Sequence, residues 1–564
     1  MKKRWTGVLA LLLALLLLCG CGGASLPAEG REAAKAPIAF EKIVYTRPNL
    51  AALEAVEGEI EALLGGEGNL KRVMDKLDEF YDLEGEAYTM ASVANIRNSH
   101  DLTDPFYAAE YAASSEILIE IESLHDALYR ACAASRYAGQ LSGEYFPEGL
   151  LDEYGPEQES PYTERLMALL REETELTAEY RALMADPVIE FKGQEIRFYD
   201  SFTVADTEED WLAVFNAYYD KYNALAGEIY RKLLKNRRQQ AAELGYDSCA
   251  AMYYEQSYAR DYSPAEADAF MESVRQILAP LQRRVQAEQS LMETEFDGVE
   301  EADLIAAIRN IGKGLGGPAK ETADFLTRYR FYDLGWNENK AMTSFEDYLW
   351  DYQAPFLFLS PYETSYDYIG VSHEFGHCVE TYISCGADRS LDFAECFSQS
   401  MQLLALEPLK KQLTNAQAES LRMQNLVGLL DTYTQQCAQA SFEREAYALD
   451  DPSVEQLNVL YGRVMENFGE LPAEDGVDKS WFEVTHFFEQ PFYVIGYPAS
   501  AGMAAEVYER ELQTPGEGYA LFCRLIDVQA PGVVGAAEEA GMKNPLSRER
   551  VRAVADFLEK QLFP

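Results

Sequence analysis

Two of the five histidines in this chain of 564 residues flank an acid in the stretch His373-Glu374-Phe375-Gly376-His377. If the stretch is helical, the two imidazoles lie four residues apart and project from one face, about 40° apart. That geometry suits two ligands of one Zn²⁺, with Glu374 placed as a general base for water at an open coordination position. Two ordinary helix histidines beside an acid are the alternative, but about 0.01 such matches are expected by chance. The pattern therefore predicts a zinc site.

A zinc hydrolase needs a third protein ligand, and Glu395 follows His377 by eighteen residues. Gly386 between them can turn the chain and bring a second helix back over the first. Two His, one Glu and an open position are typical of a catalytic zinc rather than a structural one. Glu380 is the rival ligand, but it lies a turn beyond the metal, where a supporting or surface role is expected. Asp392 could orient a ligand imidazole or cap a helix.

The remaining candidate donors lie in an aromatic run that begins at His486 and includes Tyr493 and Tyr497. The two tyrosines are four residues apart, so helical or turned backbone places both phenols on one side. Attack of water on a peptide carbonyl builds an oxyanion, which phenol and imidazole donors stabilise. A run of core aromatics is the competing interpretation, and chemistry alone favours it.

The cysteines give no disulfide framework. Seven remain after positions 19 and 21, an odd number scattered through a long chain, and most are expected to be buried thiols. Cys378, Cys385 and Cys396 lie near the histidine motif, where a thiolate could ligate zinc, but core positions are expected for all three. Cys378 and Cys385 would lie about 10 Å apart on one helix, too far for a disulfide.

The elements that carry these residues are mainly helices. Apolar spacings of three and four predict helices within 41–143, over 163–184 and over 208–244. Capping boxes at Ser263 and Thr414 start further helices, and Pro280 should kink or end one of them. Alternating apolar residues around a turn at Lys192-Gly193 predict one hairpin within 187–198. The sequence thus predicts a nearly all-α fold with a few short strands.

One predicted strand, Ala354–Ser360, lies just before the histidine motif. An exposed edge there could bind an extended peptide by strand addition. A buried connector is the alternative, and the sequence favours neither.

The first residues predict that the protein is exported from the cytoplasm. Three cations precede an apolar run too short to span a bilayer, and Leu18-Cys-Gly-Cys21 resembles a bacterial lipobox. Cys21 is then the lipidated first residue of a membrane lipoprotein that faces outward, with simple secretion as the alternative. We expect a signal peptide over 1–20, a flexible leash over 21–40, an N-terminal helical domain over 41–200 and a catalytic domain over 201–564.

The chain is strongly acidic, with a formal charge of −47 that becomes −50 when residues 1–20, with three cations and no acids, are removed. Such a field repels nucleic acid and anionic lipid, so neither is an expected partner. It attracts cationic peptides, although an acidic surface also simply keeps an exported protein soluble. The sequence sets no oligomeric state.

Together, these motifs resemble the M3 metallopeptidases, in particular the oligoendopeptidase F branch of the thimet oligopeptidase-like proteins. His-Glu-Phe-Gly-His, then Ala-Glu-Cys-Phe-Ser-Gln, then His486 with Pro-Phe-Tyr493 and Tyr497 carry the resemblance. Weaker likeness covers Phe191–Ile196, Ala242–Tyr246, Lys340 and Ala540–Pro545, so it extends from about residue 160 to the C terminus. The family's third zinc ligand, a Glu on the next helix as in other gluzincins, corresponds to Glu395.

This resemblance implies a multi-helix clamshell with a deep central channel that admits short peptides, one Zn²⁺ per chain, and His486, Tyr493 and Tyr497 as the groups that bind and polarise the scissile carbonyl. The chain departs from the family pattern at Glu380, where a further His is frequent, and at Ile495-Gly496 and Ala341-Met342. A lipobox is also unusual in a family that is mostly cytoplasmic.

The expected function is a zinc endopeptidase that hydrolyses short oligopeptides outside the membrane, with Glu374 as general base and His373, His377 and Glu395 as metal ligands. A peptide-binding surface lipoprotein without turnover is one alternative. A dipeptidyl carboxypeptidase or carboxypeptidase on a related helical zinc fold is another.

Overall fold

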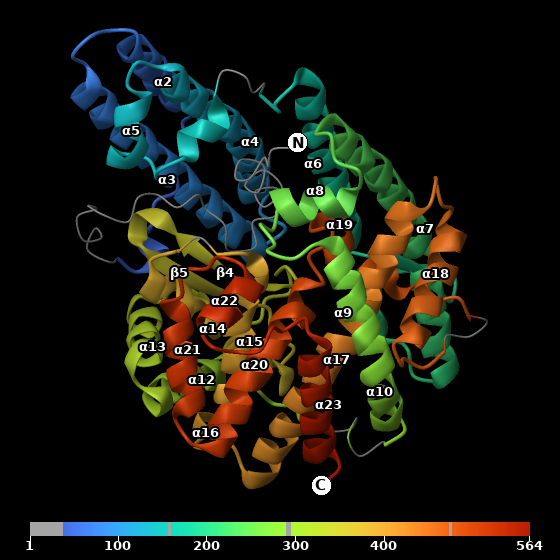
Figure 1. Ribbon diagram of the computed structural model, residues 1–564. Coiled ribbons are helices and arrows are strands. Elements are labelled where there is room, and N and C mark those ends of the chain that lie inside the picture. Colours follow the sequence, from blue (N-terminus) through green and yellow to red (C-terminus); the bar gives the residue numbers. More distant parts are fainter. Residues whose placement is uncertain (1–37, 156–159, 289–290, 292–294, 388, 473–475) are drawn as a thin grey trace.

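The computed structural model describes residues 38–155, 160–288, 291, 295–387, 389–472 and 476–564. The predicted signal peptide and nearly all of the leash, including Cys21, lie outside the described residues. The predicted fold class is confirmed: the chain is a mostly helical clamshell with a few short strands (Figure 1). None of the helices in the described ranges is long and apolar enough to cross a membrane.

The N-terminal helices, blue to cyan in Figure 1, form a unit at the upper left of the molecule. They are α2 (Leu50–Leu64), α3 (Leu70–His100), α4 (Pro105–Ala134) and α5 (Ala138–Glu144), with α6 (Glu164–Ala185) following. Leucines, valines and aromatics from α2, α3 and α4 pack into one apolar cluster of their own. The domain boundary expected near residue 200 stays a prediction.

A hairpin follows, with β1 (Val188–Phe191) antiparallel to β2 (Gln194–Arg197). Lys192 and Gly193 both have positive φ, 51° and 77°, as a two-residue hairpin turn requires. The hairpin predicted from alternation is thereby confirmed. It packs on α7 (Glu208–Glu243), whose Tyr222 hydroxyl accepts a hydrogen bond from the Val188 amide at 2.6 Å.

Helices make up most of the remainder. In chain order they are α8 (Cys249–Gln256), α9 (Pro264–Ile277), α10 (Ala279–Gln286), α12 (Glu301–Leu315), α13 (Gly317–Tyr329), α14 (Tyr366–Ser384), α15 (Leu391–Leu404), α16 (Leu406–Leu409), α17 (Asn415–Ala448), α18 (Val454–Asn467), α19 (Thr485–Glu489), α20 (Gly496–Gln513), α21 (Glu517–Ile526), α22 (Val533–Glu539) and α23 (Arg548–Leu562). Both predicted capping boxes are present, at Ser263 and Thr414, and the helix that contains Pro280 is divided, with α9 ending at Ile277.

A small sheet lies between the N-terminal unit and the lower body, packed on α3 and α14 (Figure 1). Its order is β3 (Tyr332–Asp333), β5 (Ala354–Leu359), β4 (Ser344–Leu349). The predicted strand before the histidine motif is thus real, but it is the central strand and every residue of it is buried. Of the two interpretations left open, the structure supports the buried one; the edge positions belong to β3 and β4.

The side chain of Lys340 is buried and stabilises this sheet through hydrogen bonds. Its buried ammonium group donates to the Leu359 carbonyl at 2.7 Å and to Asp333 Oδ1 at 2.8 Å. The β3–β4 connection is therefore fixed to the end of β5, immediately ahead of the histidine helix.

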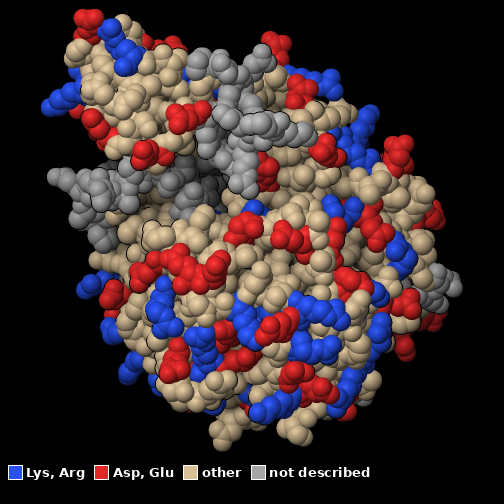
Figure 2. Space-filling view, in the orientation of Figure 1, with Lys and Arg blue, Asp and Glu red and all other residues tan. Residues whose placement is uncertain are grey.

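Two further features of the fold are its surface charge and its cysteines. On the face drawn in Figure 2, acidic and basic side chains are intermixed over the lower body, although the chain as a whole is acidic. The seven cysteines of the described ranges are all free thiols. Cys378 and Cys396 are buried, as predicted, but the core position predicted for Cys385 is wrong: it is exposed, because it ends α14 instead of packing within it.

Candidate metal centre

Helix α14 presents the two histidines of the motif, as predicted. Phe375, Cys378 and Val379 are completely buried in the main core, which fixes one face of the helix. His373 and His377 occupy another face, one turn apart, and their ring centroids are 5.1 Å from each other. The core therefore sets the direction in which both imidazoles point.

Helix α15 supplies the third group. Ser390 caps it by accepting a hydrogen bond from the Phe393 amide, and it packs directly against α14. Gly376 makes this contact possible, because a Cβ at that position would lie 2.5 Å from the Phe397 carbonyl oxygen and 2.6 Å from Ser398 Cα. The glycine of the motif thus serves helix packing, and the close approach brings Glu395 to the histidines.

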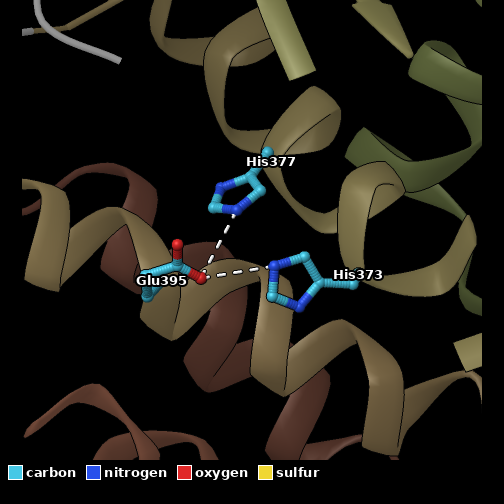
Figure 3. Close-up of side chains that lie close together, drawn as sticks. All are labelled: His373, His377 and Glu395. Atoms are coloured by element: carbon cyan, nitrogen blue, oxygen red, sulfur yellow. Dashed lines mark ion pairs between the residues drawn. The ribbon is translucent and has the colours of Figure 1, made fainter. Parts of the chain in front are cut away.

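Both imidazoles converge on a single oxygen of Glu395 (Figure 3). His373 Nε2 lies 3.3 Å and His377 Nε2 3.6 Å from Glu395 Oε2. Donors held at about 2.0–2.1 Å around a tetrahedral Zn²⁺ are themselves about 3.3 Å apart. The three donor atoms lie within 4.8 Å of one another, so the described residues fit a zinc ion with protein ligands at three positions.

The electrostatics of the site favour a cation beside Glu395. Burial alone would raise the pKa of Glu395, yet the two imidazoles hold it well below its ordinary value. Burial would likewise lower the pKa of His373, but the hydrogen bond and charge of Glu395 outweigh it and raise that pKa to about 9. A buried carboxylate that retains its charge is a suitable metal ligand.

Access to the ligands is uneven. The side chain of His373 keeps 20% of its surface exposed and that of His377 10%, whereas Glu395 keeps 4%. A small group can therefore approach from the histidine side, which a catalytic site requires.

Three neighbouring groups hold the ligands in place; two of them were not predicted, and the third, Tyr493, was predicted for a different role. Gln402 Oε1 lies 3.2 Å from His373 Nδ1, and the Ser398 hydroxyl donates to Glu395 Oε2 at 2.8 Å. The Tyr493 hydroxyl donates to Glu395 Oε1 at 2.6 Å. Gln402 lies seven residues after Glu395, two turns along the same helix face, and that spacing was the available signal.

The other acids near the motif have separate partners. Glu374 is buried, which raises its pKa, and it interacts electrostatically with all three ligands. Glu380 pairs with Arg389 Nε at 2.6 Å, so its partner is an arginine. Asp392 lies in the first turn of α15 and binds Arg260, so the prediction that it orients a ligand imidazole is not supported.

The aromatic run forms a cluster beside Glu395. His486 Nε2 and the Tyr497 hydroxyl share a hydrogen bond of 3.0 Å, and the ring centroids of Tyr493 and Tyr497 are 5.2 Å apart. The Tyr493 bond to Glu395 connects this cluster to the ligand set. Burial lowers the pKa of His486, so its imidazole is neutral at neutral pH.

Comparison with known families agrees with this site. A profile of the peptidase M3 N-terminal domain matches residues 40–152, and the profile of peptidase family M3 matches residues 320–518, which include His373, Glu395 and Tyr497. The chain thus matches an M3 N-terminal domain followed by an M3 peptidase domain. Peptidases of family M3 are zinc metalloenzymes, in agreement with the His–His–Glu group.

Solved structures share the M3 fold over nearly the whole chain. Pz peptidase A with an inhibitor matches with a TM-score of 0.80 at 20% identity, covering 93% of this chain and 99% of that chain. A structure assigned as oligoendopeptidase F matches at 0.78 and 20% identity, over 93% and 98% of the two chains. One from Bacillus anthracis with the same assignment matches at 0.76 and 20% identity, over 94% and 98%. A comparison with curated proteins gives no match.

Proposed function

We propose that this M3 chain is a zinc-dependent endopeptidase that hydrolyses short oligopeptides, of the oligoendopeptidase F type. The observation that carries the proposal is the convergence of His373 and His377 on one oxygen of Glu395, with Glu374 beside them. The aromatic cluster adjoining Glu395 supplies the donors that amide hydrolysis needs.

Zinc and Glu374 have separate roles in the proposed reaction. When bound, zinc supplies a Lewis acid that lowers the pKa of water and polarises a carbonyl. Glu374 then accepts the proton of the attacking water and passes it to the nitrogen of the leaving amine. Burial raises the pKa of Glu374 toward neutral pH. A pKa near the operating pH favours both the uptake of the proton from water and its delivery to the amine.

His486 and Tyr497 stabilise the negative charge that develops on the carbonyl oxygen of the substrate. Their shared hydrogen bond fixes both polar groups before substrate arrives, so little reorganisation is needed when negative charge develops on the carbonyl oxygen. Tyr493 differs from them, because its hydroxyl already donates to Glu395. Its geometry favours holding the ligand carboxylate, and its predicted contact with the carbonyl stays a prediction.

Replacing Tyr497 by phenylalanine is expected to lower kcat by about 10²–10³-fold, since that is the usual cost of losing one preorganised oxyanion donor. KM and zinc content should change little, because the ring is kept and no ligand is touched. Steady-state kinetics on a fluorogenic peptide measures this. A kcat equal to that of the parent would exclude Tyr497 from the reaction.

Cleavage of a mixed peptide pool, followed by mass spectrometry, tests the function as a whole. An endopeptidase yields internal fragments, a carboxypeptidase yields ladders from C termini, and a binding lipoprotein leaves every peptide intact. Only the first result agrees with the proposal, and the fragments would also report the cleavage preference.

The proposed location is the outer face of a bacterial cell membrane, through a lipid on Cys21. Expression of the full chain in a bacterial host with a lipoprotein pathway is expected to place it in the membrane fraction. A Cys21→Ser variant should then lose labelling by a radioactive fatty acid and leave that fraction. Membrane association that persists unchanged in the variant would refute the anchor.

A further inference from the structure

Buried side chains bind several backbone carbonyls of α19 and of the connection that leads from it to α20. Arg237 donates to the Phe487 carbonyl at 2.8 Å and also to the Phe488 carbonyl. The Tyr258 hydroxyl donates to the Pro491 carbonyl at 2.8 Å. This segment, 486–497, carries His486, Tyr493 and Tyr497, so its backbone position sets where those groups lie.

The strained point of segment 486–497 is Phe492, which has a φ of 63° although it is not glycine. Such a conformation persists only where the surroundings over-determine it. Here Glu443 Oε1 accepts the Phe492 amide at 2.9 Å, and Arg260 Nη1 donates to the Phe492 carbonyl at 2.9 Å. A buried carboxyl group and a buried guanidinium thus hold the residue immediately before Tyr493.

Arg260 also reaches the helix that carries the metal ligand Glu395. Its Nε and Nη2 donate to the two carboxylate oxygens of Asp392 at 2.8 and 3.0 Å, a bidentate pair. The side chains are 0% and 1% exposed. Asp392 precedes Glu395 by one turn of α15. One guanidinium therefore joins α15 to segment 486–497.

Gly496 allows this connection to be close. A Cβ on Gly496 would lie 2.5 Å from Asp392 Oδ1, and that carboxylate is already held by Arg260 and by the Tyr262 hydroxyl. The glycine, a departure from the pattern seen in the family, lies between Tyr493 and Tyr497 and fits against Asp392 of α15.

We propose that Arg260 is a positioning residue for the peptidase reaction. Through Asp392 and the Phe492 carbonyl it sets the distance between α15, with Glu395, and the segment with His486, Tyr493 and Tyr497. The 2.6 Å bond from Tyr493 to Glu395 depends on that distance. This inference rests on the proposed function, in which both groups act on one substrate.

Arg260→Lys is the first test. Lysine keeps the charge beside Asp392, but one ammonium cannot reproduce a bidentate fork and hold a carbonyl in the same geometry. We expect kcat to fall by about 10–100-fold with KM little changed, as for a misplacement of about 1 Å. Zinc release to a chelator should accelerate by about 10-fold or more, because Glu395 loses support.

Arg550→Lys is the matched control. Arg550 is a buried arginine that also binds one carbonyl, of Gly502 at 2.8 Å, and one carboxylate, of Glu509 at 2.9 Å. Its replacement should lower the melting temperature and leave kcat and zinc release unchanged. If Arg260→Lys alters kcat and zinc release no more than this control, Arg260 is merely structural and the inference is overturned.

Gly496→Ala provides a variant that removes no buried charge. Alanine favours the helix that begins at Gly496, so the protein should fold, while the added methyl displaces Asp392. The expected result is the same loss of kcat and the same faster zinc release; parental values for both would contradict the inference. The rate of zinc release tests this inference even if the parent protein cleaves no peptide. Absence of cleavage by the parent would refute the proposed function but not the positioning role of Arg260.

Discussion

Replacing Glu374 by glutamine is expected to abolish most peptide cleavage while leaving zinc bound. Glutamine matches the shape of glutamate but cannot accept the proton of the attacking water, and general-base catalysis contributes about 10²–10⁴-fold to a rate. We expect kcat to fall within that range, with zinc content and melting temperature near those of the parent. Steady-state kinetics and metal analysis of the same preparation measure both.

The matched control is Glu380→Gln on the same helix. Glu380 is also buried on α14, but it pairs with Arg389 at 2.6 Å. Breaking a buried pair costs stability, so this variant should melt earlier and retain its kcat. Full activity of Glu374→Gln would remove Glu374 from the mechanism.

Replacing Glu395 by glutamine is expected to empty the metal site. His373 and His377 both converge on Glu395 Oε2, and a neutral amide loses the charge that attracts the cation. Loss of a group that only supports a ligand lowers metal affinity by about 10–100-fold, so loss of the ligand itself should exceed that range. Competition with a chelator of known affinity measures the change.

Glu122→Gln controls for the removal of a buried acid. Glu122 lies on α4, and burial raises its pKa to about 8, so it is mostly protonated at neutral pH and glutamine is close to isosteric with it. We expect parental zinc affinity from this variant. If Glu395→Gln retained zinc as tightly, the third ligand would be another residue.

The local part of the site is predictable from the sequence, since spacing determines it. His373 and His377 share a helix face, and Gly386, with a φ of 72°, turns the chain before the helix that presents Glu395. The Lys192-Gly193 hairpin and the capping boxes at Ser263 and Thr414 depend on similarly short-range rules.

Contacts between distant segments could not be predicted in the same way. Asp392 binds Arg260, which lies 132 residues earlier, and no periodicity relates the two. The residue pattern of the Ala354–Ser360 strand is compatible with an edge position and with a central one. Its central position depends on β3 and β4, which flank it only in the folded chain. The function of Gly376 also depends on a neighbouring helix, since the Phe397 carbonyl leaves no room for a side chain.

The most direct test of the account is cleavage of a peptide blocked by N-terminal acetylation and C-terminal amidation. The purified chain should cut it internally, lose that activity on chelation and recover it with about one equivalent of zinc, consistent with one His–His–Glu site. An intact blocked peptide, or cleavage that survives complete removal of the metal, would contradict the proposal of a zinc endopeptidase.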